Sequence, residues 1–162
     1  MQNTCDLLIK NGYVVIPKVG IRNTNIVIEN EKIKELSRSL NNLSFSSSID
    51  ARGKYILPGL IDPHVHYGVY TPIDKAARTE SKSAAIGGVT TMIRMLRLDS
   101  DYKNNIKKQI NSSLQNHILD FSIHCSILTE QHLQDISYLT QETGINSFKV
   151  YMNLGSELNQ IH

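Results

Sequence analysis

The chain has 162 residues, 40% of them hydrophobic and 20% charged, which is the composition of a globular protein rather than of a disordered or fibrous one. Its formal net charge of +2, without any basic run, gives no indication of binding to nucleic acid or to an anionic membrane surface. No apolar stretch approaches the ~20 residues that span a bilayer, there is no secretory signal, and the two cysteines are too few for a disulfide framework, so a cytoplasmic location is expected.

Residues 6–36 contain four short segments rich in aliphatic residues, which we expect to be strands: 6–10, 13–16, 25–29 and 32–36. Asn11-Gly12 separates the first two and is a strong signal for a hairpin turn. Apolar and charged residues alternate in the last segment, which is typical of an antiparallel sheet with one face in water. The Ser- and Asn-rich residues 37–48 predict a loop, and a further strand follows it. We therefore expect residues 1–57 to be an N-terminal β segment.

From residue 58 onward, strand-like and helix-like segments alternate. The expected strands are 57–66, 89–93, 119–125 and 145–152, and the expected helices are 72–86, 101–115 and 129–141. Thr129 is a favourable N-cap, and Gly87 and Gly144 follow the last turns of two helices. Repeated strand–helix units predict a parallel sheet or a β/α barrel. A complete TIM-type (β/α)8 barrel has eight strands in ~250 residues, so we expect residues 58–162 to form the first four units of an incomplete barrel and the chain to be a fragment.

The first of these strands, residues 57–66, is almost wholly apolar and ends in two histidines. Side chains alternate along a strand, so His64 and His66 share one face and Val65 points to the other. The fold places its chemistry at the carboxyl ends of such strands, and two imidazoles on one face can bind one metal ion. The pattern is also compatible with a pair of surface or hydrogen-bonded core histidines. Asp62 lies one step earlier on the same face and either supports a ligand histidine by a hydrogen bond or has a structural role.

Lys149 lies in the last expected strand and shares a face with Ser147 and Tyr151. If this face points into a barrel, an isolated ammonium group is costly to desolvate and either deprotonates or acquires a partner. A neutral lysine amine can take up carbon dioxide to form a carbamate, which is an anionic oxygen ligand able to bridge two metal ions. The alternative is that Lys149 lies at the strand end and extends its amine into solvent.

The remaining candidate residues are interpreted as structural. His124, in the third expected strand, should be packed and hydrogen-bonded. We expect the other histidines outside the His-x-His pair to face solvent: His117, His132 and His162. Arg94 and Arg97 are candidates for guiding an anionic substrate, but we expect them to be solvated or paired with carboxylates.

Three segments, in this order and spacing, resemble the cyclic amidohydrolases: PGLIDPHVH at 58–66, AAIGGVTT at 84–91 and GINSFKVYM at 144–152. Hydantoinase and dihydropyrimidinase are the most similar members, with allantoinase and dihydroorotase nearby. The resemblance runs from Asp6 to about Asn153 and implies the N-terminal portion of such a protein. It also implies that residues 1–57 belong to a small β-sandwich that the C-terminal end of a full-length chain completes.

The resemblance assigns roles to three residues. His64 and His66 would be metal ligands on the first barrel strand, and a carboxylated Lys149 on the fourth strand would bridge two divalent ions, usually zinc. The ions would activate water to open a small cyclic amide, ureide or imide. The family's aspartate base and two further histidines come from later strands. The fragment is therefore expected to be inactive alone, with no catalytic residue assigned within it, and the full-length form to be a homo-oligomer.

Three departures concern the substrate side of the family pattern. Hydantoinases and dihydropyrimidinases carry a tyrosine five residues after the lysine, which stabilises an oxyanion, and this chain has Leu154 there. Dihydroorotases carry an arginine two residues after the second histidine, where this chain has Gly68. They also carry an asparagine after the second strand, where this chain reads Met95-Leu96-Arg97.

Two other hypotheses stay open. One is a non-catalytic relative that keeps the barrel as an assembly scaffold, and the other is a small α/β binding module in which the histidines are incidental. About two metal ions per full-length chain would favour the enzyme, because the two-metal mechanism requires both, and none would favour the scaffold.

Overall fold

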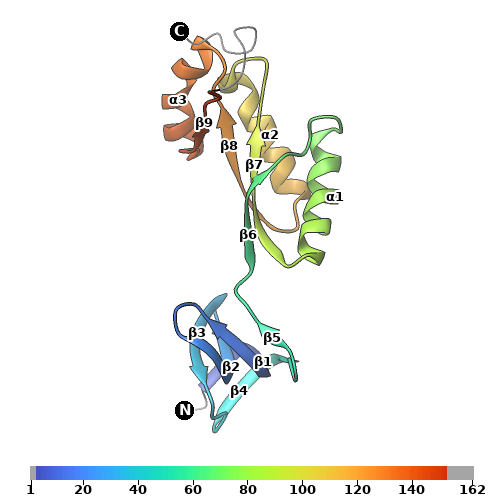
Figure 1. Cartoon of the computed structure of the whole chain (residues 1–162), viewed down its shortest axis with the longest axis vertical. Helices are drawn as coiled ribbons and strands as arrows, with labels where there is room; N and C mark the ends of the chain where they lie inside the picture. The colour runs from blue at the N-terminus through green and yellow to red at the C-terminus, as the bar shows by residue number, and fades with distance from the viewer. Residues whose placement is uncertain (1–2, 153–162) are drawn as a thin grey trace. The chain divides into compact units, whose positions relative to one another are not determined.

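The computed structural model describes residues 3–152 of the chain. It divides into two compact units, Met1–Pro58 and Gly59–His162 (Figure 1). In the described residues, the first unit is built from strands alone and the second alternates strands with helices. No helix in this part of the chain is long and apolar enough to cross a membrane.

The first unit is one mixed β-sheet. Its strands are β1 (Asn3–Ile16), β2 (Gly20–Glu29), β3 (Lys32–Ser37), β4 (Leu43–Asp50) and β5 (Tyr55–Ile56). The order is β3-β2-β1-β4, and β5 also pairs with β1. The pairs β1–β2 and β2–β3 are antiparallel, as predicted for the second pair, whereas β4 and β5 run parallel to β1. The small core of this unit consists of Cys5, Leu8 and Val27.

The prediction of a hairpin at Asn11-Gly12 is wrong. Both residues lie inside β1, where the register with β2 shifts between Ile9 and Gly12. Asn11 has a φ of +64°, and its Nδ2 donates to Asp50 Oδ1 at 3.1 Å. The left-handed backbone that Asn favours is thus used for a bulge held by a distant strand, and the chain reverses at residues 17–19 instead.

The prediction of a loop over residues 37–48 is wrong from Leu43 onward. Residues 43–50 form β4, which pairs in parallel with β1 along most of its length. Leu43 packs against the buried core of this unit. The serines that suggested a loop are tolerated in this strand because hydrogen bonds to the backbone of β1 and a few apolar contacts hold it. These contacts join residues that are far apart in sequence.

The second unit follows the predicted alternation of strands and helices. Its elements are β6 (Leu60–Val65), α1 (Ile73–Ile86), β7 (Val89–Leu96), α2 (Tyr102–Asn116), β8 (Asp120–Ser126), α3 (Glu130–Thr143) and β9 (Phe148–Lys149). The four strands are all parallel, in the order β6-β7-β8-β9. The strand predicted over residues 145–152 is reduced to Phe148–Lys149.

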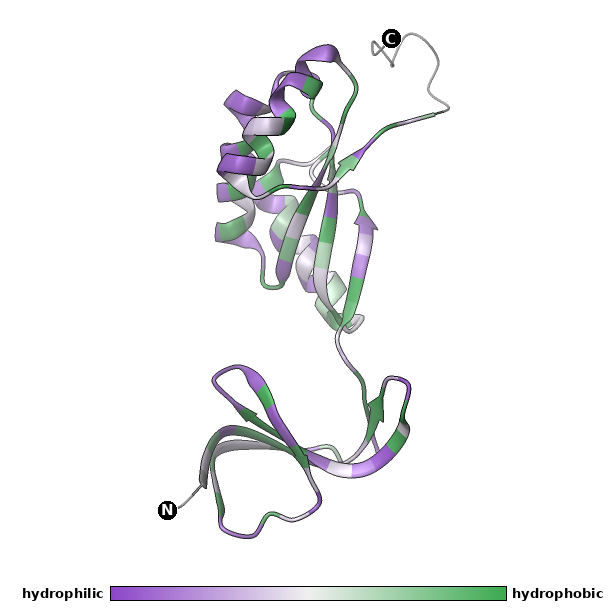
Figure 2. Cartoon of the chain, turned by 90° about the vertical axis from the view of Figure 1, so that its left-hand side faces the viewer, coloured by the Kyte–Doolittle hydropathy of each residue, from purple (hydrophilic) through white to green (hydrophobic). Residues whose placement is uncertain are grey.

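The three helices cover one face of this parallel sheet (Figure 2). On that face a core cluster joins side chains of β7 and β8 to α2 and α3: Leu96, Tyr102, Ile106, Ile123, Cys125, Leu139 and Ile145. A second cluster packs Met92 of β7 and Tyr67 against Ala76 and Ala77 of α1. We call the opposite side of the sheet the open face.

Local signals set the helix ends as predicted. The Asp101 side chain accepts from Asn104 N at the start of α2, and Thr129 accepts from His132 N at the start of α3. Gly144 ends α3 with a φ of +71°, a conformation in which a Cβ would be strained. These caps fix the starts of α2 and α3 and the end of α3.

Candidate metal centre

The two predicted histidines lie together at the carboxyl end of β6. Val65 packs into the cluster beneath α1, so its neighbours His64 and His66 point to the open face, where both are exposed. Their Nε2 atoms are 3.2 Å apart, and their ring centroids are 5.2 Å apart. His64 lies within β6, whereas His66 follows the last residue of the strand.

Lys149 lies at the carboxyl end of β9, where it pairs with Ser126 of β8. Its Nζ is 3.5 Å from His64 Nε2 and 4.5 Å from the centroid of the Tyr151 ring. The predicted convergence of three side chains is therefore present in the structure: the two imidazoles and the lysine amine, from strands 85 positions apart in sequence, meet on the open face.

The geometry of the histidine pair fits a metal ion. Two nitrogens that ligate one tetrahedral zinc ion at ~2.0–2.1 Å lie about 3.3 Å apart, and the observed separation is 3.2 Å. Partial burial, together with the charges of His64 and Lys149, lowers the pKa of His66 below its ordinary value. A lowered pKa keeps this imidazole neutral near pH 7, which is the form that binds metal.

The described residues do not supply a complete metal-binding set by themselves. Within residues 3–152, no group of three or more His, Cys, Asp or Glu side chains lies close enough to hold an ion. The third donor beside the histidines is a lysine, which can ligate through oxygen only after carboxylation.

Asp62 contacts the backbone of the candidate centre rather than an imidazole. Its Oδ1 accepts a hydrogen bond from His64 N at 3.1 Å, and the side chain is partly buried. Pro63 lies between the two and has no backbone N–H. Asp62 therefore fixes the backbone at His64, where the strand register is irregular.

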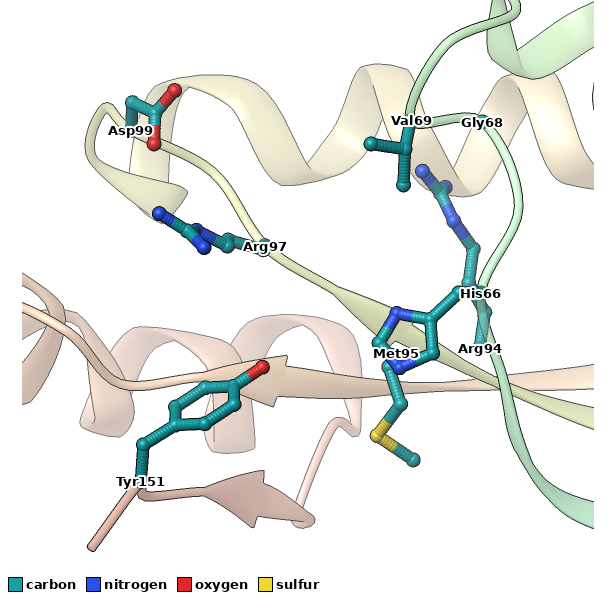
Figure 3. A pocket seen from close by; sticks show the side chains of 8 residues that line it. All are labelled: His66, Gly68, Val69, Arg94, Met95, Arg97, Asp99 and Tyr151. Atoms are coloured by element: carbon teal, nitrogen blue, oxygen red, sulfur yellow. The ribbon is translucent and has the colours of Figure 1, made fainter. Parts of the chain in front are cut away.

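A cavity of about 410 Å³ lies next to His66 (Figure 3). Its lining comes from the segment after β6, from β7 and the segment after it, and from Tyr151: His66, Gly68, Val69, Arg94, Met95, Arg97, Asp99 and Tyr151. The hydroxyl group of Tyr151 and the imidazole of His66 both point into it (Figure 3). The wall is mixed, with two guanidinium groups, one carboxylate and apolar side chains, and it is large enough for a small cyclic molecule.

Three of the residues that we interpreted as exposed are not. His132 is 1% exposed, its Nδ1 accepts from Leu128 N, and its Nε2 donates to Ser100 O. His117 is partly buried, with Nε2 only 2.6 Å from Tyr67 Oη. The prediction that these two face solvent is wrong because each imidazole satisfies backbone or phenol groups from another element, a requirement that local sequence does not reveal.

Arg94 is the third, and the expectation of a solvated or carboxylate-paired guanidinium is wrong for it. It is 3% exposed, and in the described residues its hydrogen-bond partners are a backbone carbonyl and a glutamine. Arg97, by contrast, is exposed. His124 is hydrogen-bonded as predicted, with Ser147 Oγ 2.8 Å from its Nδ1. Leu154 and His162 lie outside the described residues.

Comparison with known proteins finds similarity to hydantoinases and a dihydropyrimidinase. No family model matches the chain. The D-hydantoinase of Geobacillus stearothermophilus is 34% identical over 154 residues, which cover 90% of this chain and 32% of the relative. A solved D-hydantoinase structure superposes with a TM-score of 0.78 at 28% identity, over 97% of this chain and 35% of the other. The dihydropyrimidinase of Brevibacillus agri NCHU1002 superposes with a TM-score of 0.75 at 25% identity, over 95% of this chain and 34% of the other.

These matches confirm the predicted fold class, which is half of a TIM-type barrel preceded by a β-rich segment. Over most of its length the chain is similar to hydantoinases and dihydropyrimidinases, as the resemblance implied. It spans about a third of the length of the curated relatives that it matches.

Proposed function

We propose that this chain forms the metal-binding part of a cyclic amidohydrolase that opens the ring of a small cyclic amide or ureide. The observation that carries the proposal is the approach of His64, His66 and Lys149 on the open face, with two imidazole nitrogens 3.2 Å apart and the lysine amine 3.5 Å from one of them. The substrate class follows from the relatives, which are named hydantoinases, and a dihydroorotase-like or allantoinase-like ring remains within the proposal.

In this proposal the chain's own residues have distinct roles. His64 and His66 would each donate a neutral Nε2 to a divalent ion, with zinc the expected metal. The amine of Lys149 would form an N–C bond with carbon dioxide and lose a proton, and the resulting carbamate would supply oxygen ligands to two ions. Asp62 would hold the backbone of the first ligand through its bond to His64 N.

The bound metal would supply an activated water at neutral pH and polarise the carbonyl of the ring. The cavity beside His66 would hold that ring. Met95 and Val69 would contact the apolar atoms of the ring, and the Tyr151 hydroxyl group would lie beside it. The remaining ligands and the proton-transferring base belong to the later strands of a complete barrel, as in the family that the chain resembles. We accordingly propose that residues 1–57 and 58–162 act as two parts of a longer homo-oligomeric enzyme.

Two features of the chain support a cytoplasmic location for this enzyme. Both cysteines, Cys5 and Cys125, are free thiols, and both are buried within their own units. Buried free thiols persist most readily in a reducing compartment.

The metal centre is tested by titrating the 162-residue chain with Co²⁺, whose visible absorption reports nitrogen ligation, and by competition with Zn²⁺. We expect saturable binding that is lost in the double variant His64→Ala/His66→Ala. Prior incubation with bicarbonate should strengthen binding in the wild type but not in Lys149→Ala. Equal Co²⁺ binding by the wild type and the double variant would contradict the proposed centre.

The reaction is tested in a chimera in which residues 3–152 replace the matching segment of the Geobacillus stearothermophilus D-hydantoinase. We expect hydantoin to be converted to its N-carbamoyl product, and His64→Ala to abolish this conversion. A folded chimera that binds two metal ions but leaves the ring intact would contradict the hydrolase. A chimera that binds none would support the alternative of a non-catalytic scaffold.

A further inference from the structure

Arg94 is a buried cation on the strand that pairs with β6, and it lines the same cavity as His66. It lies on β7 and is 3% exposed. Within residues 3–152 the ion pairs are Lys34–Glu29 and Arg52–Asp50, so no carboxylate of this region neutralises Arg94. Burying a guanidinium without a counter-ion is unfavourable. The hydrogen bonds that Arg94 makes must therefore offset this cost, and they show which parts of the chain it holds.

The hydrogen bonds of Arg94 converge on the segment that follows His66. Its Nε donates to Tyr67 O at 2.9 Å, and its Nη1 donates to Gln109 Oε1 of α2 at 2.9 Å. The guanidinium carbon also lies 5.1 Å from the centroid of the Tyr67 ring, within range of a cation–π contact.

Gly68 allows this close approach. A Cβ at this position would lie 2.9 Å from Arg94 Nη2 and 3.1 Å from Ile73 Cδ1. The residue also has a φ of +74°, which other L-residues rarely adopt. The backbone of Tyr67 and Gly68 is thus shaped around the guanidinium group.

The position of His66 explains why such a contact is needed. The last residue of β6 that pairs with β7 is Val65, and its partner is Arg94 itself. His66 follows it and is exposed, without a ladder position of its own. Arg94 therefore holds the chain on both sides of His66, through its backbone pairing at Val65 and through its side chain at Tyr67.

Tyr67 provides the second anchor of this segment. It is 5% exposed and packs against Ala76, Ala77 and Met92. Its Oη lies 2.6 Å from His117 Nε2 at the end of α2. The residue after His66 is therefore fixed at its carbonyl by Arg94 and at its hydroxyl by His117.

We propose that Arg94 is a positioning residue for the metal centre: its bond to the Tyr67 carbonyl holds the backbone after His66 so that His66 Nε2 stays beside His64 Nε2. This inference rests on the proposed function, because it takes the histidine pair to be a metal site. A distorted pair binds an ion more weakly, and removing a partner that orients a ligand typically lowers metal affinity by ~10–100-fold.

The test compares Arg94→Met with Gln109→Leu in the 162-residue chain. Both substitutions remove the Arg94–Gln109 bond, but only Arg94→Met also removes the bond to Tyr67 O. Co²⁺ affinity is measured by absorption titration, and the melting temperature is measured without metal. We expect Arg94→Met to weaken Co²⁺ binding by about tenfold or more, and Gln109→Leu to lower the melting temperature while leaving affinity within about twofold of wild type.

Arg94→Lys is the second variant, to be measured if Arg94→Met does not fold. Lysine keeps the charge but offers no planar fork that can bond Tyr67 and Gln109 together, so we expect an affinity between those of Arg94→Met and Gln109→Leu. Folded Arg94 variants that bind Co²⁺ as tightly as Gln109→Leu would overturn the positioning role. If His66→Ala binds Co²⁺ as tightly as wild type, the metal centre itself is overturned instead, so the two failures are distinguishable.

Discussion

The two faces of the β6–β9 sheet differ in their roles: one packs against the helices and the other carries the candidate metal centre. On the helix-covered face, alternate residues of β8 such as Ile123 and Cys125 are buried against α2 and α3. The open face carries His64, His66 and Lys149, and His64 Nε2 lies 3.2 Å from His66 Nε2 and 3.5 Å from Lys149 Nζ. The difference teaches that most of the stability and the candidate chemistry come from alternate positions of the same strands. Substitutions on one face should therefore leave the property of the other unchanged, except at Arg94, whose side chain bonds the backbone beside His66.

Thiol labelling should separate the two faces most strongly. Burial raises the pKa of Cys125 to about 12, so its reactive thiolate is scarce at pH 8 and increases only as the pH rises toward that value. A cysteine at exposed Ser122, on the open face of the same strand, would keep a pKa near 9. We expect Cys125 in Cys5→Ser to react roughly a thousandfold more slowly than the new thiol in Cys5→Ser/Ser122→Cys. The rates are measured with a chromogenic disulfide at pH 8. Comparable rates for the two thiols would contradict the assignment of a buried face and an open face.

Truncation in the helix-side core should give the largest loss of stability. Leu139 of α3 is completely buried among β8 and α2 side chains. We expect Leu139→Ala to lower the free energy of unfolding by about 2–5 kcal/mol. The matched control is Leu114→Ala on α2, where the side chain is 65% exposed and the expected change is within ~0.5 kcal/mol. Urea unfolding monitored by circular dichroism measures both, and similar losses would contradict the assigned core.

A smaller loss is expected where α3 holds the start of α2. Asp135 is 3% exposed, and its Oδ2 accepts from Tyr102 N at 2.7 Å and from Lys103 N at 3.3 Å. Asp135→Ala leaves these donors without their partner, and we expect a loss of about 1–3 kcal/mol. Asp101→Ala removes the exposed cap of the same helix and should cost about 1 kcal/mol. An order of effects opposite to this one in urea unfolding would show that the buried carboxylate is dispensable.

The smallest effect on stability is expected on the open face. His64 is exposed, so His64→Ala should change the free energy of unfolding by no more than ~0.5 kcal/mol without metal. With Zn²⁺ at a hundred times its dissociation constant, the wild type should gain about 2.7 kcal/mol and the variant none. Calorimetry with and without Zn²⁺ measures this difference, and an equal gain in both proteins would place the zinc elsewhere.

Local signals explain what could be predicted from the sequence. The helix ends at Asp101, Thr129 and Gly144 depend on bonds within a few residues, and they lie where expected. The alternation along β6 placed His64 and His66 on one face for the same reason. The meeting with Lys149 was predicted through the family resemblance, because β6 and β9 are the outermost strands of the sheet and strand order alone does not bring them together.

Long-range contacts explain what could not. β4 is a serine-rich strand because β1 pairs with it, and Asn11 supplies a bulge because Asp50 lies opposite. The position of Arg94 depends on Tyr67 and Gln109, which lie 27 and 15 residues away. Neither composition nor periodicity near Arg94 contains that information, and a single arginine in a β-branched strand gives no signal of burial.

The end of β6 at Val65 gives the two imidazoles different supports. His64 lies within the strand, whereas His66 lies beyond it, on a backbone that Arg94 and His117 hold through Tyr67. Substitutions at these supporting residues can therefore change the spacing of the pair while leaving the sheet intact. In the proposed enzyme, selectivity among divalent metals would then be tuned by residues that never touch the ion.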